Sequence, residues 1–342
     1  MKQKFITNLL LLLLLNLLIK PFWIFGIDRT VQNLVGDENY GFYFALFNFS
    51  LILNILLDVG ITSYNNRNIA RHHFLLPKHL SNIIGLKLLL AIVYALFCLI
   101  VAAIIGYNKI QIHLLIFLIL NQFLVSFILY LRSNISALHL FRTDSLISVL
   151  DRTLMIIICS ILLFTHRFRE QFTISWFVYA QTASYLLTTI ITFAVVMQKS
   201  GRFRIQFNPA FFVVFLRKSY PYAILILLMS LYNRIDSVML ERMLPGTRGH
   251  EQAGIYAQAF RLLDAVSMFG VLFAGLLLPI FSKMIKQGES VGQMVKLSYT
   301  LLIVPAIVIA VSSLYYDQEI MSVFKKTKTP YITQFLGIWC LG

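Results

Sequence analysis

Nine apolar segments, each long enough to cross a membrane, constrain the fold of this 342-residue chain more than any other feature. They cover residues 5–27, 40–62, 81–105, 111–131, 145–165, 173–197, 217–240, 254–281 and 294–316, and a tenth begins near Tyr331. A membrane-spanning helix needs about 20 mostly apolar residues. Because a chain inside lipid must satisfy its own backbone hydrogen bonds, such segments fold as helices. We therefore expect an all-α, polytopic transmembrane helical bundle.

The composition agrees with a lipid environment. Hydrophobic residues make up 59% of the chain and charged residues 13%, against about 25% charged residues in soluble domains. The net charge of +15 would suit nucleic acid, but the basic residues lie between apolar runs. That placement is typical of cytoplasmic loops, so we expect no nucleic-acid partner. The cysteines Cys98, Cys159 and Cys340 lie inside apolar stretches and predict neither disulfides nor a metal site.

Loop charges predict how the helices are oriented. If the N-terminus is cytoplasmic, the inner loops carry 15 lysines and arginines and the outer loops carry 9. This excess favours a cytoplasmic N-terminus, although three lysines in the last outer loop weaken it. The first segment is followed by Lys20-Pro21-Phe22-Trp23 and not by a small-residue cleavage site, so we expect a retained helix and not a signal peptide.

A short pattern occurs twice, with every position offset by 213 residues. Six of its seven positions are identical and the seventh keeps an acid: Asp28-Arg29, Gly36, Glu38, Gly41, Tyr43 and Phe47 recur as Glu241-Arg242, Gly249, Glu251, Gly254, Tyr256 and Phe260. The offset spans six helices, an even number, so the two copies enter the membrane in the same direction. Parallel repeats of this kind are typical of transporters that bind substrate between their halves.

The repeat also predicts the domain organisation. We expect a six-helix lobe over residues 1–200 and a second lobe over 201–342. A full second copy would reach about residue 426, so the second repeat is expected to be incomplete. Gly36 and Gly249 suit a turn, whereas Gly41 and Gly254 suit a close helix contact.

Polar side chains inside the apolar segments are the strongest candidates for a binding site. A charge at mid-membrane costs about 2.5–3.5 kcal/mol on insertion scales, so such residues usually face a cavity or a partner. The candidate residues are Lys20, Asn54, Asp58, Asn233, Arg234, Asp236, Gln258, Arg261 and Asp264. A cavity holding the cations would attract an anion such as a diphosphate. The acids could neutralise those cations or bind a coupling cation.

Structural roles are open for several of these residues. Lys20 could extend its ammonium group to the membrane surface, and Lys87 is expected to extend toward the cytoplasm. Asp58 could cap its helix, and Arg261 could pair with Asp264 at i, i+3. Arg234 is the firmest cavity candidate, because it shares one helix face with three polar neighbours: Ser230, Asn233 and Ser237.

Catalytic motifs and cofactor sites are not predicted. The sequence holds no Walker loop, no HExxH motif and no Ser-His-Asp spacing. His72, His73 and His79 cluster in a predicted inner loop without a carboxylate or cysteine beside them, so we expect a solvated loop and no metal there. We therefore expect no cofactor and no enzyme activity.

Several short runs resemble one family of membrane proteins. They are Gly41-Phe42-Tyr43 through Leu57-Asp58-Val59-Gly60, Arg67-Asn68-Ile69-Ala70-Arg71, Asn233-Arg234-Ile235-Asp236 with Met239-Leu240, Ala253-Gly254-Ile255-Tyr256 through Phe260-Arg261, and Leu278-Pro279 with Phe281-Ser282. These runs resemble bacterial O-antigen and capsule flippases, in the superfamily that also holds the multidrug and toxin extruders (MATE). The resemblance implies two lobes with twelve to fourteen spans in all, around a cavity that opens alternately to each side.

The resemblance also implies a cargo and partners. The cargo would be an undecaprenyl-diphosphate-linked oligosaccharide, moved from the cytoplasmic to the outer leaflet of a bacterial inner membrane for O-antigen, capsule or exopolysaccharide assembly. The expected partners are membrane lipid, H⁺ or Na⁺ as coupling ion, a polysaccharide polymerase and glycosyltransferases.

Three alternatives stay open at this stage. A multidrug cation antiporter of the same superfamily would need a cavity dominated by acids. A membrane glycosyltransferase or polymerase could use Asp28, Asp37 and Glu38, but the acidic pattern recurs in the second copy, where another active site makes little sense. A scaffold that transports nothing is the third alternative.

Overall fold

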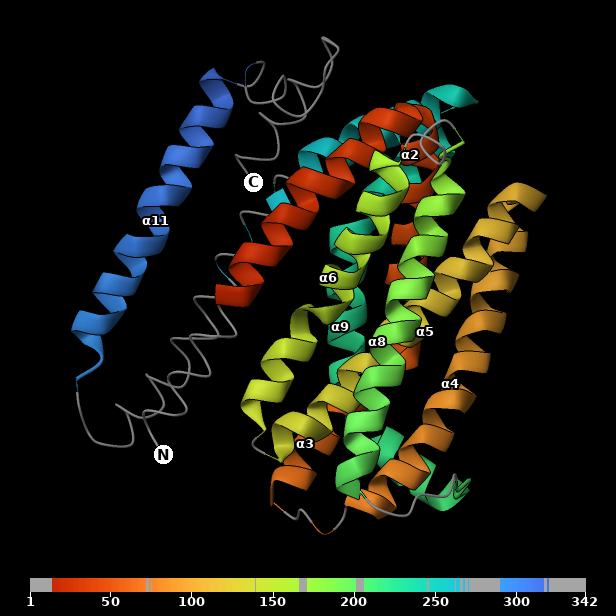
Figure 1. Ribbon diagram of the computed structural model, residues 1–342, viewed down its shortest axis with the longest axis vertical. Coiled ribbons are helices and arrows are strands. Elements are labelled where there is room, and N and C mark those ends of the chain that lie inside the picture. Colours follow the sequence, from red (N-terminus) through yellow and green to blue (C-terminus); the bar gives the residue numbers. More distant parts are fainter. Residues whose placement is uncertain are drawn as a thin grey trace.

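The computed structural model describes residues 14–71, 74, 76–138, 140–165, 171–200, 206–244, 246–261, 263, 264, 267, 270, 290–316 and 319. Every regular element in these ranges is a helix, which confirms the all-α prediction (Figure 1). Five helical stretches within them are long and apolar enough to cross a membrane: Leu14–Leu57, Leu76–Ile105, Lys109–Ala137, Phe141–Phe164 and Ile174–Ser200. The chain is therefore a multi-pass membrane protein.

The first two predicted spans are joined by a helical corner and not by an open loop. Helical residues 14–22 continue into a π-helix η1 (Trp23–Asp28) and then into α2 (Arg29–Ile52). The helix breaks only at Gly36, whose φ of 82° and ψ of 162° suit glycine alone. The predicted turn at Gly36 is thus confirmed. The rest of the expected outer loop is helical, because the change of chain direction is made at this one glycine.

The second predicted span, 40–62, ends earlier than expected. After α2, the 3₁₀-helix η2 (Leu53–Leu57) leads into a break at Asp58–Gly60. Val59 and Gly60 there have φ of 45° and 78°, in the left-handed region. A separate polar helix, α3 (Ile61–Arg71), follows. This break frees the last carbonyl groups of η2 for other partners.

The remaining helices of the N-terminal half agree with the predicted spans. They are α4 (Leu76–Ile105), α5 (Lys109–Ala137), α6 (Phe141–Phe164) and α8 (Ile174–Ser200). A capping box between Asn108 and Gln111 starts α5. Along α4, Ile92, Leu96 and Ile100 are exposed, as expected for a face that contacts lipid tails.

The predicted solvated histidine loop is only partly within the described residues. His79 lies in the first turn of α4, where it is buried beside Asn65 with 3.4 Å between Nδ1 and Oδ1. It therefore belongs to the packing between α3 and α4, which corrects the expectation of a solvated side chain. His72 and His73 lie outside the described residues.

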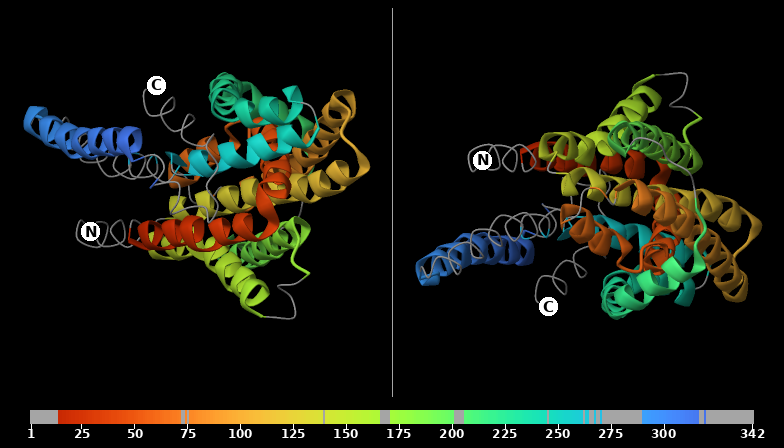
Figure 2. Two further views of the ribbon diagram at one scale, coloured as in Figure 1. Left: turned by 90° about the horizontal axis from the view of Figure 1, so that it is seen from above. Right: turned by 90° about the horizontal axis from the view of Figure 1, so that it is seen from below.

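The second half is described in part. Helix α9 (Pro209–Met243) covers the predicted span 217–240, residues 247–261 are helical, and α11 (Gly292–Tyr315) matches the predicted span 294–316. Figures 1 and 2 both show α11 standing apart from the main bundle. The end of the predicted span 254–281, the tenth segment and Cys340 lie outside the described residues, as does the lobe boundary at 201–205.

Two glycines from the repeat meet where its two copies cross. A Cβ atom added to Gly41 would lie 1.8 Å from the carbonyl oxygen of His250, and one added to Gly254 would lie 2.1 Å from that of Asp37. Only hydrogen fits at either position, so the predicted close helix contact is confirmed. The predicted turn at Gly249 is wrong: Gly249 is helical, and Gly246, with a φ of 63°, makes the turn.

Candidate functional site

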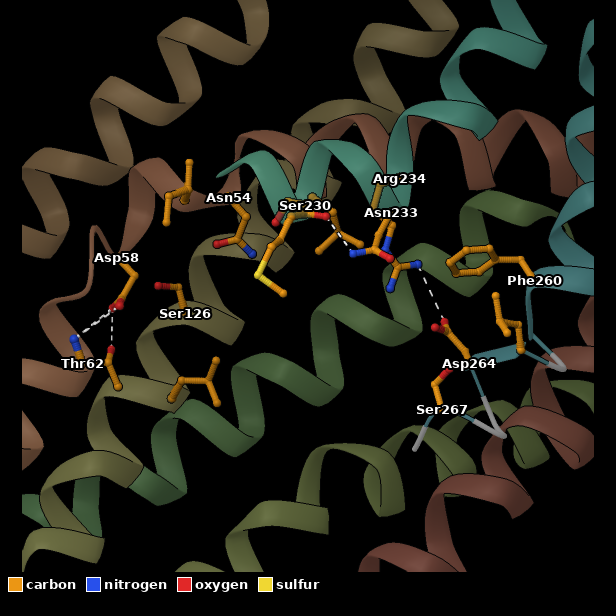
Figure 3. Close-up of a pocket in the computed structure, with 15 residues that line it drawn as sticks. Asn54, Asp58, Thr62, Ser126, Ser230, Asn233, Arg234, Phe260, Asp264 and Ser267 are labelled. Atoms are coloured by element: carbon orange, nitrogen blue, oxygen red, sulfur yellow. Dashed lines mark hydrogen bonds and ion pairs between the residues drawn. The ribbon is translucent and has the colours of Figure 1, made fainter. Parts of the chain in front are cut away.

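Two cavities lie side by side between the first half of the chain and the helices α9 and 247–261. The Asp58 cavity, of about 790 Å³, is lined by Leu51, Asn54, Ile55, Asp58, Thr62, Ser126, Leu129, Met229, Ser230, Asn233, Arg234, Phe260, Leu263, Asp264 and Ser267 (Figure 3). The Lys20 cavity, of about 390 Å³, is lined by Lys20, Trp23, Ile24, Asp28, Tyr40, Tyr43, Phe44, Phe47, Leu51, Arg152, Gln181, Tyr185, Arg234, Arg261 and Asp264. Leu51, Arg234 and Asp264 line both, so the cavities adjoin at these side chains.

Arg234 occupies the junction of the two cavities. Its guanidinium nitrogen Nη1 lies 3.7 Å from Asp264 Oδ2 and donates to Asn48 Oδ1 at 3.4 Å. The same group stands 4.8 Å from the centre of the Phe260 ring, within the range of a cation–π contact. Figure 3 shows Arg234, Asn233 and Ser230 on the wall formed by α9. The structure thus brings three of the four residues of the predicted polar face to the cavity.

Ser237, the fourth residue of that face, is buried and donates to the carbonyl oxygen of Arg234. It supports α9 locally and does not line either cavity.

Asp58 both lines its cavity and caps a helix. Its carboxylate accepts the backbone N–H of Thr62 at 3.3 Å, at the start of α3, and also the Thr62 hydroxyl. Its Oδ1 lies 2.6 Å from the ammonium nitrogen of Lys87. Lys87 is only 1% exposed, so the prediction that it extends toward the cytoplasm is wrong. The broken end of η2 and the carboxylate hold this ammonium inside the bundle.

Cations outnumber acids around the Lys20 cavity. Four cationic side chains and two carboxylates line it, and a third carboxylate, Asp151, pairs with Arg152, which leaves an excess of one positive charge. Arg261 pairs with Asp28 at 2.7 Å and stands 4.2 Å from the Tyr40 ring centre. The expected pair between Arg261 and Asp264 does not form, because each finds a closer partner on another helix.

Lys20 lines the cavity and has no salt bridge or hydrogen bond to any residue that the structure describes. Arg152 of α6 lines the same cavity, with its guanidinium carbon 5.7 Å from the Trp23 ring centre and Nε 3.6 Å from Asp151. The sequence reasoning missed Arg152. The signal was present, since Arg152 is a charge inside the apolar segment 145–165.

Asp236 and Gln258 lie outside both cavities. The hydroxyl of Tyr256 donates to Asp236 Oδ2 at 3.1 Å. Gln258 is buried, and its Nε2 donates to Asp37 Oδ1 at 2.9 Å. The first contact joins α9 to residues 247–261, and the second joins that helix to α2.

A further set of polar contacts joins the two halves at the end that holds Gly36. This Glu241 cluster consists of Tyr107, Gln111, Glu241, Arg242 and His250. Gln111 donates to Glu241 at 3.0 Å, and Glu241 pairs with Arg242 at 2.9 Å. Arg242 stands 3.9 Å from the Tyr107 ring centre. Burial, with the nearby Glu241 carboxylate, raises the pKa of Tyr107 to about 12, so this ring stays neutral at physiological pH.

No group of three metal-ligating side chains occurs among the residues that the structure describes. The candidate site is a polar crevice lined by guanidinium, ammonium, carboxylate, amide and hydroxyl groups. The cationic, amide and hydroxyl groups can recognise anions and hydroxylated molecules, and the carboxylates can accept cations.

Comparisons with known proteins bear on this arrangement. Residues 6–285 match the family described as polysaccharide biosynthesis protein. No curated protein matches the chain. One similar solved structure is described as the inward-facing conformation of a multidrug resistance MATE family transporter of the MOP superfamily. Its TM-score is 0.61 with 12% identity, over 93% of this chain and 75% of that one.

A second similar structure is described as the outward-facing conformation of a multidrug resistance MATE family transporter of the MOP superfamily. Its TM-score is 0.58 with 16% identity, over 97% of this chain and 77% of that one. At these identities the likeness shows the fold alone, and that fold is MATE-like.

Proposed function

The chain belongs to the polysaccharide biosynthesis protein family, and from this premise we propose that it carries an undecaprenyl-diphosphate-linked oligosaccharide from the cytoplasmic to the outer leaflet of a bacterial inner membrane. Family membership and a MATE-like fold support a transporter of the MOP superfamily. The cargo would serve O-antigen, capsule or exopolysaccharide assembly. The glycosyltransferases that build the cargo and the polymerase that uses it are the expected partners.

The observation that carries the proposal is the cationic excess of the Lys20 cavity. Arg261 is paired with Asp28, but Lys20 has no such partner in the described part of the chain, and Arg152 faces the same space. Lys20 and Arg152 can each bind a diphosphate by charge-assisted hydrogen bonds, which are about twice as strong as neutral ones. In this proposal Lys20 and Arg152 hold the headgroup, and Arg234 holds it at the passage between the cavities.

The Asp58 cavity suits the sugar. Its lining offers amides and hydroxyls from Asn54, Asn233, Ser126 and Ser230, which match sugar hydroxyls, and the Phe260 ring provides an apolar face. Its volume of about 790 Å³ lies within the usual range of ligand sites, about 300–1,000 Å³. The polyprenyl tail would stay in the bilayer beside the crevice.

We propose that the crevice opens alternately between a lobe at residues 1–200 and a lobe at 201–342. Contacts between the two halves at the Gly36 end, such as Gln111 with Glu241, favour a form closed at that end. With the N-terminus cytoplasmic, that end faces outward. An inside-negative potential would drive the anionic headgroup outward by about 2.3 kcal/mol per charge per 100 mV.

A coupling ion, H⁺ or Na⁺, has one well-placed acceptor among the predicted acids. Asp58 is paired with Lys87, and Asp236 accepts from Tyr256. Asp264 is 48% exposed and faces both cavities, so it can take a proton or Na⁺ as Arg234 turns toward the substrate.

A multidrug cation antiporter is the second candidate, and Asp58 and Asp264 on the larger cavity favour it. The cationic Lys20 cavity would repel such a substrate. The enzyme alternative loses two of its three acids to structural contacts, since Asp28 pairs with Arg261 and Asp37 accepts from Gln258.

The test is surface glycan in a cell that depends on this protein for its display. We expect Arg234→Ala to reduce glycan display by about tenfold or more, since one hydrogen bond to a charged group contributes about 1.5–3 kcal/mol. The matched control is Arg142→Ala, which removes an exposed arginine at the start of α6. Protein levels in the membrane are measured for both. Normal display with Arg234→Ala would remove Arg234 from the site, and altered drug sensitivity with normal glycan would favour the second candidate.

A further inference from the structure

Four oxygen atoms, from the broken end of η2 and from α5, lie within hydrogen-bonding distance of the Lys87 ammonium group. Its Nζ lies 2.6 Å from Asp58 Oδ1, 2.8 Å from Ser126 Oγ, 3.2 Å from the Leu57 carbonyl oxygen and 3.4 Å from the Ser126 carbonyl oxygen. The ammonium group is thus surrounded by a carboxylate, a hydroxyl and two backbone carbonyls. We call these four oxygens the Lys87 site.

The oxygens come from two helices and the lysine from a third. Leu57 and Asp58 end η2, Ser126 belongs to α5, and Lys87 reaches them from α4. The carbonyl of Leu57 is available because the left-handed residues Val59 and Gly60 stop the helix there. In membrane transporters, carbonyls of an interrupted helix together with the negative end of its dipole coordinate cations. The Lys87 site is such a set of ligands.

The Lys87 site also borders the candidate substrate path. Asp58 and Ser126 both line the Asp58 cavity, whereas Lys87 itself is 1% exposed. Two of the four ligand oxygens, Asp58 Oδ1 and Ser126 Oγ, thus belong to residues that an inorganic cation in the cavity could reach. The lysine ammonium already occupies the position that such a cation would take.

We propose that Lys87 is a tethered cation that fills a monovalent-cation site in this chain, so that the protein needs no inorganic ion there. The proposal goes beyond the transport of any particular cargo. It predicts that removing the ammonium uncovers a site for Na⁺ or K⁺, because the carboxylate and carbonyls would then lack a positive charge within the membrane.

The test measures the thermal midpoint of the purified protein in detergent, in NaCl, KCl or choline chloride at equal ionic strength. Wild type should show no Na⁺ or K⁺ response that Asp58→Asn abolishes, because an ion at Asp264 would not use the Lys87 site. Lys87→Ala should be less stable in choline chloride, and Na⁺ or K⁺ should raise its Tm saturably by about 2 °C or more. The double variant Lys87→Ala/Asp58→Asn should lose that response, because its oxygens no longer carry a negative charge.

Lys199→Ala is the matched control, since it removes an exposed lysine from the last turn of α8 and should behave as wild type. Three results would overturn the proposal. The first is a Lys87→Ala variant whose Tm in choline chloride equals its Tm in NaCl and KCl. The second is a Lys87→Ala variant that folds in none of the salts. The third is a rise of the wild-type Tm in NaCl that Asp58→Asn abolishes. Because thermal unfolding requires no transport, the outcome is independent of the proposed cargo.

Discussion

Arg261 and Lys20 line the same cavity but differ in how their charges are balanced. Arg261 is buried against Asp28 and the Tyr40 ring, so its charge is compensated within the protein. Lys20 has no such partner among the described residues, which leaves its charge available to a ligand. The two cations therefore have different expected roles: Arg261 stabilises the fold, whereas Lys20 is the proposed contact to the diphosphate.

The role of Arg261 can be tested through stability. Arg261→Ala leaves the Asp28 carboxylate uncompensated inside the bundle, and breaking a buried pair costs about 3–5 kcal/mol. We expect a large drop in Tm in detergent, and we expect Arg261→Ala/Asp28→Asn to recover much of it, because the unpaired charge is gone. Equal Tm values for the single and double variants would show that the pair is not what stabilises this contact.

Candidate residues can be recognised in the sequence where a polar side chain stands out from its apolar segment. The cavities are lined by seven of the nine candidate residues, Lys20, Asn54, Asp58, Asn233, Arg234, Arg261 and Asp264. That any of them binds substrate stays a prediction. Arg152 is likewise a charge inside an apolar segment and lines the Lys20 cavity, but it was not among the predicted residues. The partners could not be predicted, because Arg261 meets Asp28 across 233 positions of the chain and nothing local encodes that pairing.

At the scale of helices, the crossing of α2 with residues 247–261 depends on two glycines. Gly41→Ala should cost about 3 kcal/mol or more, above the usual 1–3 kcal/mol for overpacking, because the obstacle is backbone and cannot rotate away. Thermal unfolding of the purified variant checks this value. Gly26→Ala is the control, since its added Cβ would make only ordinary contacts of 3.7 Å or longer with the Phe22 ring. A stable Gly41→Ala protein would refute the tight crossing.

The helix breaks were predictable only in part. Gly36 stands among polar residues between two apolar segments, so its turn was expected. The break at Asp58–Gly60 was not, because apolar residues on both sides of it, Leu56, Leu57 and Ile61, continue the hydrophobic pattern of the second span. A hydropathy pattern reports where a chain meets lipid, and it does not report the local φ values that end a helix.

For the molecule as a whole, the repeat predicted that equivalent positions of the two copies would serve equivalent needs, and Gly41 and Gly254 do meet. How the halves contact each other elsewhere was not predicted. The Glu241 cluster joins α9 to α5 through side chains whose distance in sequence is about 130 residues. Only the folded arrangement places them together.

Transport by alternating access requires the Glu241 cluster to separate. Cysteines replacing Gln111 and Glu241, joined by a short bifunctional reagent, should therefore abolish transport in cells. In the control pair, cysteines replace His113 on α5 and Tyr179 on α8, both in the first half of the chain. In the native protein, His113 Nε2 and the Tyr179 hydroxyl lie 3.1 Å apart. Cross-linking this second pair should leave transport unchanged. Full transport by the cross-linked 111–241 protein would show that the halves do not part at this end.

The most direct test of the central claim, that a cationic crevice carries a diphosphate-linked sugar across the bilayer, is reconstitution. Liposomes would hold the protein and a fluorescent polyprenyl-diphosphate oligosaccharide, and an external glycosidase would report the sugar reaching the outer leaflet. We predict transfer with wild type and with Lys199→Ala. With Lys20→Ala we predict that the transfer rate falls by about tenfold or more. Transfer by wild type no faster than in protein-free liposomes, or an unchanged rate with Lys20→Ala, would contradict the account.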